Sequence, residues 1–315
     1  MDGKKKSPSV FEINLFYLVI AILVIFIGAY VQKKDIYSGL VITEYVLILL
    51  PTILYLKVRG YSLKRVLKLN KLSLKQGLLI PLIVLLSYPI GAFLNAIMAL
   101  ILSTFGELIP PPLPTPTSGG SFFIGLLVIA LSPGICEEIM FRGMLMKAYD
   151  RKGVKNSIIF SAILFGVFHF NIQNLLGPIF LGVLFGYIVY KTNSIYSSIL
   201  AHTTNNAIAW TLTYFIGKSG IDPSKAKEVG MQMPYTVQMA LGALMLGGIA
   251  LVTGTGAYFL IKALPKDKNS LLNEDVKIEK NETSEKSLLI QYSPIIGIAV
   301  IYVVITFKII KMIQM

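Results

Sequence analysis

The stretch Ser-Pro-Gly-Ile-Cys-Glu-Glu-Ile-Met-Phe-Arg-Gly at residues 132–143 places three charged side chains inside an apolar run of the chain. They are Glu137, Glu138 and Arg142. One charge at the centre of a membrane helix costs about 2.5–3.5 kcal/mol on insertion scales. Three charges so close together therefore need internal partners or a function, and an ionisable group inside a membrane is by default a candidate functional residue.

The composition predicts a polytopic helical membrane protein. Of the 315 residues, 55% are hydrophobic and only 14% are charged, whereas a soluble globular protein carries about 25% charged residues. Repeated apolar runs of about 20 residues are typical of membrane-spanning helices. The net charge of +13 does not indicate a nucleic-acid partner, because the basic residues lie in short loops beside the apolar runs, where they set membrane orientation.

The expected fold is therefore all-α, a membrane helical bundle with about eight core transmembrane helices and an extra C-terminal span. The first apolar run is interpreted as a retained span and not as a signal peptide, because it is long and no small-residue cleavage site follows it. Nine spans are expected, at residues 10–30, 37–56, 77–104, 121–149, 155–171, 175–190, 194–216, 235–262 and 288–309.

The basic residues are distributed unequally between the two ends of these spans. With alternating spans, 22 of the 29 Lys and Arg residues fall on the side of the N-terminus. The positive-inside rule then predicts a cytoplasmic N-terminus, an external C-terminus and contact with a lipid bilayer.

Four parts are expected along the chain. Residues 1–76 hold two spans and a basic segment, 77–262 form a catalytic helical core, 263–287 are a flexible charged linker and 288–315 form a C-terminal span. Residues 110–120, with five prolines, are expected to form an outer loop. In the basic segment, apolar residues spaced to line one side of a helix predict a helix on the inner membrane surface, the alternative being a solvated loop. Those residues are Leu63, Val66, Leu67 and Leu69.

Further polar side chains accompany the charged stretch. The two histidines of the chain, His169 and His202, are both expected inside apolar spans. Asn206 follows His202 by four residues and shares its helix face, while Asn205 is expected to point elsewhere.

Spacing along the helices predicts the depth of these groups. A turn near Lys152 makes the fourth and fifth spans an antiparallel hairpin, which puts Glu137 and His169 roughly 23–26 Å from the turn. His202 and Asn206 lie roughly 14–20 Å into the seventh span by the same rise. All four side chains can therefore converge below the membrane surface.

Helix geometry distinguishes the two glutamates. Glu138 and Arg142 are four residues apart and lie on one face, where they can form an ion pair, whereas Glu137 is rotated about 140° from Arg142. Glu137 is thus left free to face His169 across the hairpin.

Each group also has a structural interpretation. A single intramembrane His or Asn is often only an interhelical hydrogen-bonding group, and the Glu138–Arg142 pair can be purely structural. Cys136 is expected to be a small buried filler and Trp210 a packing residue. Glu12 and Glu44 are assigned no role.

Three motifs together resemble a known family. They are Glu-Glu-x-x-x-Arg at 137–142, Phe-x-x-x-His at 165–169 and His-x-x-x-Asn at 202–206. In order and spacing they are similar to the motifs of the CPBP family, which comprises the type 2 CAAX prenyl proteases and the bacteriocin-processing and immunity proteins, also called intramembrane glutamic endopeptidases or the Abi group. The motifs span about a third of the chain, residues 121–210.

The resemblance implies an eight-helix core and a peptidase site inside the membrane. In that family pattern Glu137 and His169 position and deprotonate a water that attacks the scissile carbonyl, and His202 and Asn206 donate to the developing oxyanion. Glu138, Arg142 and Phe165 would support them. The implied substrate is a peptide or protein, prenylated or not, with a CAAX-like C-terminal tail or a peptide precursor. No cofactor or metal is expected, and the expected location is the plasma membrane of a prokaryote.

Two other functions remain open at this point. Glu137, His169 and His202 are residue types that bind zinc, which would make the protein a metalloprotease, although no helical His-Glu-x-x-His pair is present. A non-catalytic role as an immunity protein or scaffold is the second alternative, because a sequence does not show turnover.

Overall fold

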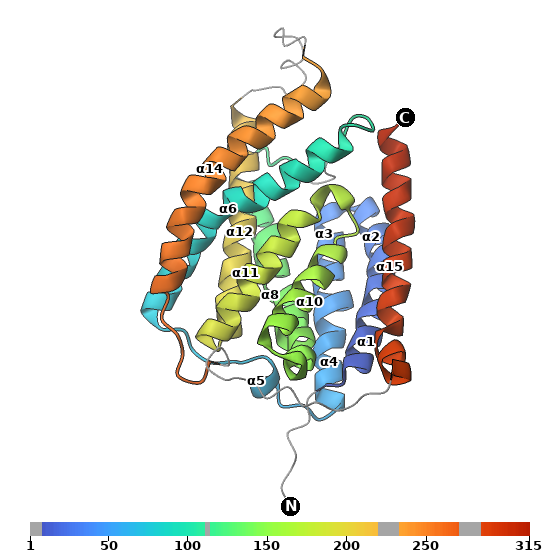
Figure 1. Cartoon of the computed structure of the whole chain (residues 1–315), viewed down its shortest axis with the longest axis vertical. Coiled ribbons are helices and arrows are strands. Elements are labelled where there is room, and N and C mark those ends of the chain that lie inside the picture. The colour runs from blue at the N-terminus through green and yellow to red at the C-terminus, as the bar shows by residue number, and fades with distance from the viewer. Residues whose placement is uncertain (1–7, 111–113, 220–232, 271–284) are drawn as a thin grey trace, which may run out of the picture.

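The computed structural model describes residues 8–110, 114–219, 233–270 and 285–315, which fold into helices with no strand among them (Figure 1). The all-α prediction is confirmed, and each expected span falls on a helix or on consecutive helical segments. The bounds are α1 Val10–Leu23, η1 Val24–Gly28, α2 Ala29–Lys34, α3 Ile36–Val41, η2 Ile42–Leu49, α4 Leu50–Val58, α5 Leu63–Val66, α6 Leu74–Leu102, α7 Gly119–Gly125, η3 Leu126–Leu131, α8 Ser132–Glu138, η4 Ile139–Leu145, α9 Met146–Tyr149, η5 Asp150–Lys152, α10 Val154–Val167, η6 Ile172–Asn174, α11 Leu176–Thr192, α12 Ile195–Lys218, α14 Tyr235–Ala263 and α15 Glu285–Ile313.

Seven helical runs in the described part of the chain are long and apolar enough to cross a membrane. Two further expected spans do not meet that standard. The first, α10, is apolar but has only 14 residues, and the second, α12, has 24 residues but is less apolar because it carries polar side chains at its centre. These two helices hold or adjoin both histidines, so the polar site accounts for the weaker signal.

Three of the long runs contain π-helical turns. They are η1 in the first run, η2 in the second, and η3 and η4 on either side of α8 in the fourth. A π turn widens the helix and changes the direction of the side chains that follow it, and such turns are frequent at functional sites. The segments η2 and η4 both pack against α8.

The helices are arranged in three groups across the molecule (Figure 1). On one side α6 packs along α14, and on the other α1 packs along α15. Between them lie α8, α10, α11 and α12. The C-terminal helix α15 is held to α1 partly by a hydrogen bond of 2.9 Å from Asn14 Nδ2 to the Gln291 carbonyl.

The helix α5 and the chain that follows α14 lie at the lower end in Figure 1. Tyr190, near the end of α11, contacts residues beside both and in η5: its hydroxyl donates to Asp150 in η5, its carbonyl accepts from Ser270 Oγ at 2.6 Å, and Lys68 Nζ lies 5.0 Å from its ring centroid. The described loops on either side of α5, around η5 and after α14 therefore meet at one end of the bundle.

The basic segment 57–76 differs from the expected surface helix. Only α5, four residues long, is a separate helix there, and Val66 and Leu67 are buried in the protein core. Lys68 adopts φ 49°, which ends the turn, and its carbonyl accepts from Ile195 N at 3.1 Å. Burial lowers the pKa of the Lys68 ammonium. The apolar side chains thus pack on the bundle and not in lipid headgroups.

The expected linker begins as an ordered segment. Asp267 N donates to the Lys191 carbonyl at 2.9 Å, which ties residues after α14 to the end of α11. Most of the rest of the expected linker, residues 271–284, lies outside the described residues. In the Pro-rich stretch 110–120, residues 111–113 are not described, and residues 114–118 are non-helical. Ser118 caps α7, because its Oγ accepts a hydrogen bond from Ser121 N.

Candidate active site

The helices α8 and α12 approach each other closely at a glycine. A Cβ atom at Gly134 would lie 2.3 Å from Thr203 Oγ1, so only a residue without a side chain fits there. This approach places the last residues of α8, Glu137 and Glu138, beside His202 on α12.

Glu138 is the centre of a buried ionic network. Its Oε1 atom lies 2.8 Å from Arg142 Nη1 and 2.9 Å from His202 Nδ1, and all three side chains are buried. The pair between Glu138 and Arg142 expected from their spacing is present. The contact with His202 was not expected, because sequence spacing does not report how α8 and α12 meet.

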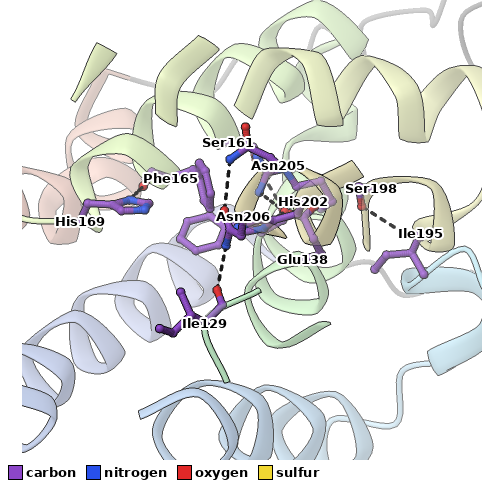
Figure 2. A network of polar contacts seen from close by, with 12 residues as sticks. Ile129, Glu138, Ser161, Phe165, His169, Ile195, Ser198, His202, Asn205 and Asn206 are labelled. Carbon is purple, nitrogen blue, oxygen red and sulfur yellow. Dashed lines mark hydrogen bonds and ion pairs between the residues drawn. The ribbon is translucent and has the colours of Figure 1, made fainter. Parts of the chain in front are cut away.

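Aromatic rings enclose this network. The Arg142 guanidinium carbon lies 4.2 Å from the Phe165 ring centroid and 5.5 Å from that of Phe185. Phe165 also makes edge contacts with His169 at 5.1 Å and His202 at 5.6 Å, and Figure 2 shows its ring between the two histidines. Phe165 therefore separates the ionic network from His169.

His169 lies just beyond the end of α10 and not inside a helix, which corrects the sequence-based expectation. Phe170 has φ 47°, a left-handed conformation that stops the helix. His169 Nδ1 lies 2.9 Å from the Phe165 carbonyl, one of the carbonyls that a helix end leaves without an intrahelical donor. Its side chain is exposed, while that of His202 is buried.

Asn206 and Asn205 act together on α12. Asn206 Nδ2 donates to the Ile129 carbonyl at 3.2 Å, and Asn205 Nδ2 donates to Asn206 Oδ1 at 3.1 Å (Figure 2). Asn205 was expected to point away, but both amides line the same cavity. The α12-side surface of the cavity therefore includes two consecutive residues of the helix, although their side chains leave it in different directions.

Two cavities meet at the site. The α12-side cavity, of about 440 Å³, is lined by Glu137, His169, His202 and Asn206, so the structure brings all four predicted site residues together. The α1-side cavity, of about 380 Å³, is lined mainly by apolar residues of η1, η2 and the turn after α10, together with Ile305 of α15. Three side chains line both cavities: Glu44, Glu137 and His169.

Glu137 and Glu138 differ in their surroundings, because Glu137 faces the cavities and Glu138 belongs to the ionic network. Within the described residues, Glu137 Oε2 is buried without a hydrogen-bond partner, although Glu137 lines both cavities. Glu138 Oε2 is likewise buried without a partner there, but Glu138 Oε1 is bonded to two cationic or potentially cationic groups, Arg142 and His202. Glu137 is the carboxylate that can meet a molecule in the cavity.

Glu44 is the residue that sequence reasoning did not place in the site. It lies in η2, is 4% exposed, and its Oε2 atom also has no hydrogen-bond partner in the described part of the chain. The available signal was a glutamate in the middle of an apolar run. Because a charged side chain is costly inside a membrane helix, this position alone could have identified Glu44 as a candidate functional residue.

Three other residues considered in the sequence, Glu12, Cys136 and Trp210, are held by contacts within the protein. Glu12 pairs with Arg59 and accepts from the Tyr55 hydroxyl at 3.2 Å, away from the site. Cys136 is fully buried. Trp210 packs on Gly125 and donates to the Phe122 carbonyl at 2.9 Å, and it also lines the α12-side cavity.

The donor set gives no evident metal centre. Among the residues that the structure describes, no three His, Cys, Asp or Glu side chains are grouped as metal ligands would be. Both histidines already use Nδ1 within the protein, on the Phe165 carbonyl and on Glu138.

Comparison with known families agrees with the motifs. Residues 119–208 match the family model described as type II CAAX prenyl endopeptidase Rce1-like, which confirms the resemblance over this segment. The segment contains Glu137, Glu138, Arg142, His169, His202 and Asn206. Neither a curated protein nor a solved structure gives a significant match to the chain.

Proposed function

We propose that the chain is an intramembrane endopeptidase that hydrolyses a peptide bond in a C-terminal CAAX-like tail or in a peptide precursor. The observation that carries this proposal is the cavity shared by Glu137, His169, His202 and Asn206, in which Glu137 Oε2 has no hydrogen-bond partner among the described residues. The match of residues 119–208 to a type II CAAX prenyl endopeptidase model supports the same reaction class.

The base in the proposed reaction is Glu137. A water between Glu137 and His169 loses a proton to the Glu137 carboxylate as its oxygen attacks the scissile carbonyl carbon. His169 Nδ1 is held by the Phe165 carbonyl, so Nε2 is the nitrogen left to orient that water. The proton then passes to the leaving amine as the carbon–nitrogen bond breaks.

The oxyanion is stabilised from α12. His202 Nδ1 is hydrogen-bonded to Glu138, so Nε2 is the ring nitrogen available to the cavity. Nε2 can donate a hydrogen bond when the imidazole carries both protons. Asn206 Nδ2 uses one hydrogen on Ile129 and has a second to donate. Losing one such donor typically costs about 10²–10³ in rate.

The peptide is proposed to lie along the amides of the α12-side cavity. Asn95, Asn174 and Asn205 line it with the site residues. Side-chain amides can both donate to and accept from an extended backbone, which needs such partners when it leaves water. These groups fit a peptide substrate better than a purely apolar ligand.

The experiment that tests the proposal is mass spectrometry of membrane peptides from cells that express the protein or its Glu137→Ala variant. Peptides with new C-termini should appear with the unaltered chain and be absent with the variant at equal protein level. Identical peptide sets would instead support a non-catalytic scaffold or immunity role.

A further inference from the structure

Two glutamates, and not one, lie at the junction of the two cavities. Glu44 on η2 and Glu137 on α8 come from helices that pack directly together, and both side chains line both cavities. Their exposed fractions are 4% and 9%.

Among the residues that the structure describes, neither carboxylate forms an ion pair with a cation. Each has a buried Oε2 atom without a hydrogen-bond partner in the described part of the chain. The nearby guanidinium of Arg142 is paired with Glu138. The other titratable groups around Glu44 are Cys136 of α8, Tyr88 of α6, His169 after α10 and His202 of α12.

Two ionised carboxylates in such a place would repel each other with little water to screen them. Neighbouring carboxylates in a protein solve this by holding one proton in common, which also satisfies one of the free oxygens through a hydrogen bond. A protonated Glu44 would donate to Glu137 and leave Glu137 ionised as an acceptor.

We propose that Glu44 is a positioning residue for the site: it shares one proton with Glu137, and in its protonated form it hydrogen-bonds to Glu137 and holds that carboxylate ionised and oriented. Glu44 acts through Glu137 and does not itself touch the substrate. Only the activity test of this positioning role rests on the proposed peptidase function. The shared proton itself can be observed without any substrate.

The direct test is infrared difference spectroscopy of the purified full-length protein in lipid vesicles. At about pH 7, one buried protonated carboxyl should give a carbonyl band, and Glu44→Gln should remove it. In Glu137→Gln the band should still be present at low pH. As the pH is raised it should disappear at a lower pH than in the unaltered protein, because the second carboxylate no longer opposes ionisation of Glu44. Glu12→Gln, which alters a carboxylate paired with Arg59, is the matched control and should leave the band unchanged.

Three infrared results would overturn the proposal. They are no band in the unaltered protein, a band that survives Glu44→Gln, and a band whose titration is the same with and without Glu137. The last result would mean that Glu44 is protonated by burial alone.

Activity supplies a second, separable test with an internally quenched S-farnesylated peptide that has a CAAX-like tail. Glu44→Gln still offers an amide donor and should keep the acidic limb of the pH–rate profile. Glu44→Leu offers none, so the acidic limb should move to higher pH, with a rate loss about tenfold greater at about pH 6 than at about pH 8.

Thermal melts should show Glu44→Leu folded, because it replaces a buried carboxylate with an apolar group of similar size. Equal pH profiles for the Gln and Leu variants would contradict the positioning role. If the unaltered protein gives the band but cuts no peptide, the shared proton stands and the proposed peptidase function fails.

Discussion

His202 Nδ1 lies 2.9 Å from Glu138 Oε1, the same oxygen that accepts from Arg142. One buried carboxylate therefore connects a structural ion pair to a residue of the candidate site. The spacing of Glu138 and Arg142 indicated only the ion pair. In the structure Glu138 also fixes which ring nitrogen of His202 can face the cavity.

Removing the arginine of this network should be strongly destabilising. Arg142→Ala leaves the Glu138 charge in a dry site without its arginine partner, and breaking a buried pair in this way costs about 3–5 kcal/mol. The matched control is Arg59→Ala, because Arg59 pairs with Glu12 but is half exposed. Solvent screens that exposed pair, so its loss should shift the melt much less.

The two variants are compared by thermal melts of the detergent-solubilised protein, monitored by circular dichroism. Equal shifts for the buried and the exposed arginine would contradict the structural account of the network.

Helix packing gives a prediction for Gly182. A Cβ there would meet the backbone of Ala162 at 2.7 Å, so α10 and α11 would have to separate. Gly182→Ala should therefore destabilise by about 1–3 kcal/mol, as overpacking does. Gly242→Ala is the control, because nothing lies within 4 Å of its added methyl and Ala favours a helix. A melt of Gly182→Ala at or above that of Gly242→Ala would show that the helices are not so close.

The local features of the site could be predicted from the sequence. Apolar length predicts the helices, and i,i+4 spacing predicts the pair of Glu138 with Arg142. The depth of Glu137 and His169 from their common turn predicts that both reach one cavity. Each of these inferences uses distances along one helix or one hairpin, which are set by helix rise and rotation.

Features that depend on distant helices could not be predicted. Glu44 reaches Glu137 only because η2 packs on α8, and no spacing along the chain reports that contact. His202 meets Glu138 for the same kind of reason, through the approach of Thr203 to Gly134. Residues 57–76 were expected to lie along the inner membrane surface, because their apolar side chains do not reveal whether protein or membrane covers them.

Membrane orientation remains a prediction from the charge distribution, and reporter fusions test it. A reporter fused after Met315 should be external and one inserted near Asn273 cytoplasmic, because the charge count places most basic residues on the side of the N-terminus. The opposite pattern would reverse the orientation. Two reporters on the same side would instead contradict the assignment of α15 as a span.

Metal dependence is predicted to be absent. If Glu137 and His169 activate the water without a metal, cleavage should persist after exhaustive chelation, and elemental analysis should find no stoichiometric zinc. Loss of cleavage on chelation, with recovery on adding zinc, would instead assign Glu137, His169 and His202 as ligands.

The central claim is that Glu137 is the base and Glu138 the structural partner. Glu137→Gln should remain folded, because the amide keeps the shape of the side chain, but should lose about 10²–10⁴ in rate because an amide cannot take a proton. Glu138→Gln should be destabilised by about 3–5 kcal/mol, because Arg142 loses its charged partner. Its folded fraction should still cleave, at a reduced rate, since His202 loses its anchor.

The most direct measurement compares these two variants by thermal melt and by cleavage rate per folded molecule on the S-farnesylated peptide. We expect a stable, inactive Glu137→Gln and an unstable, partly active Glu138→Gln. A stable, inactive Glu138→Gln together with an active Glu137→Gln would contradict it and reverse the two roles.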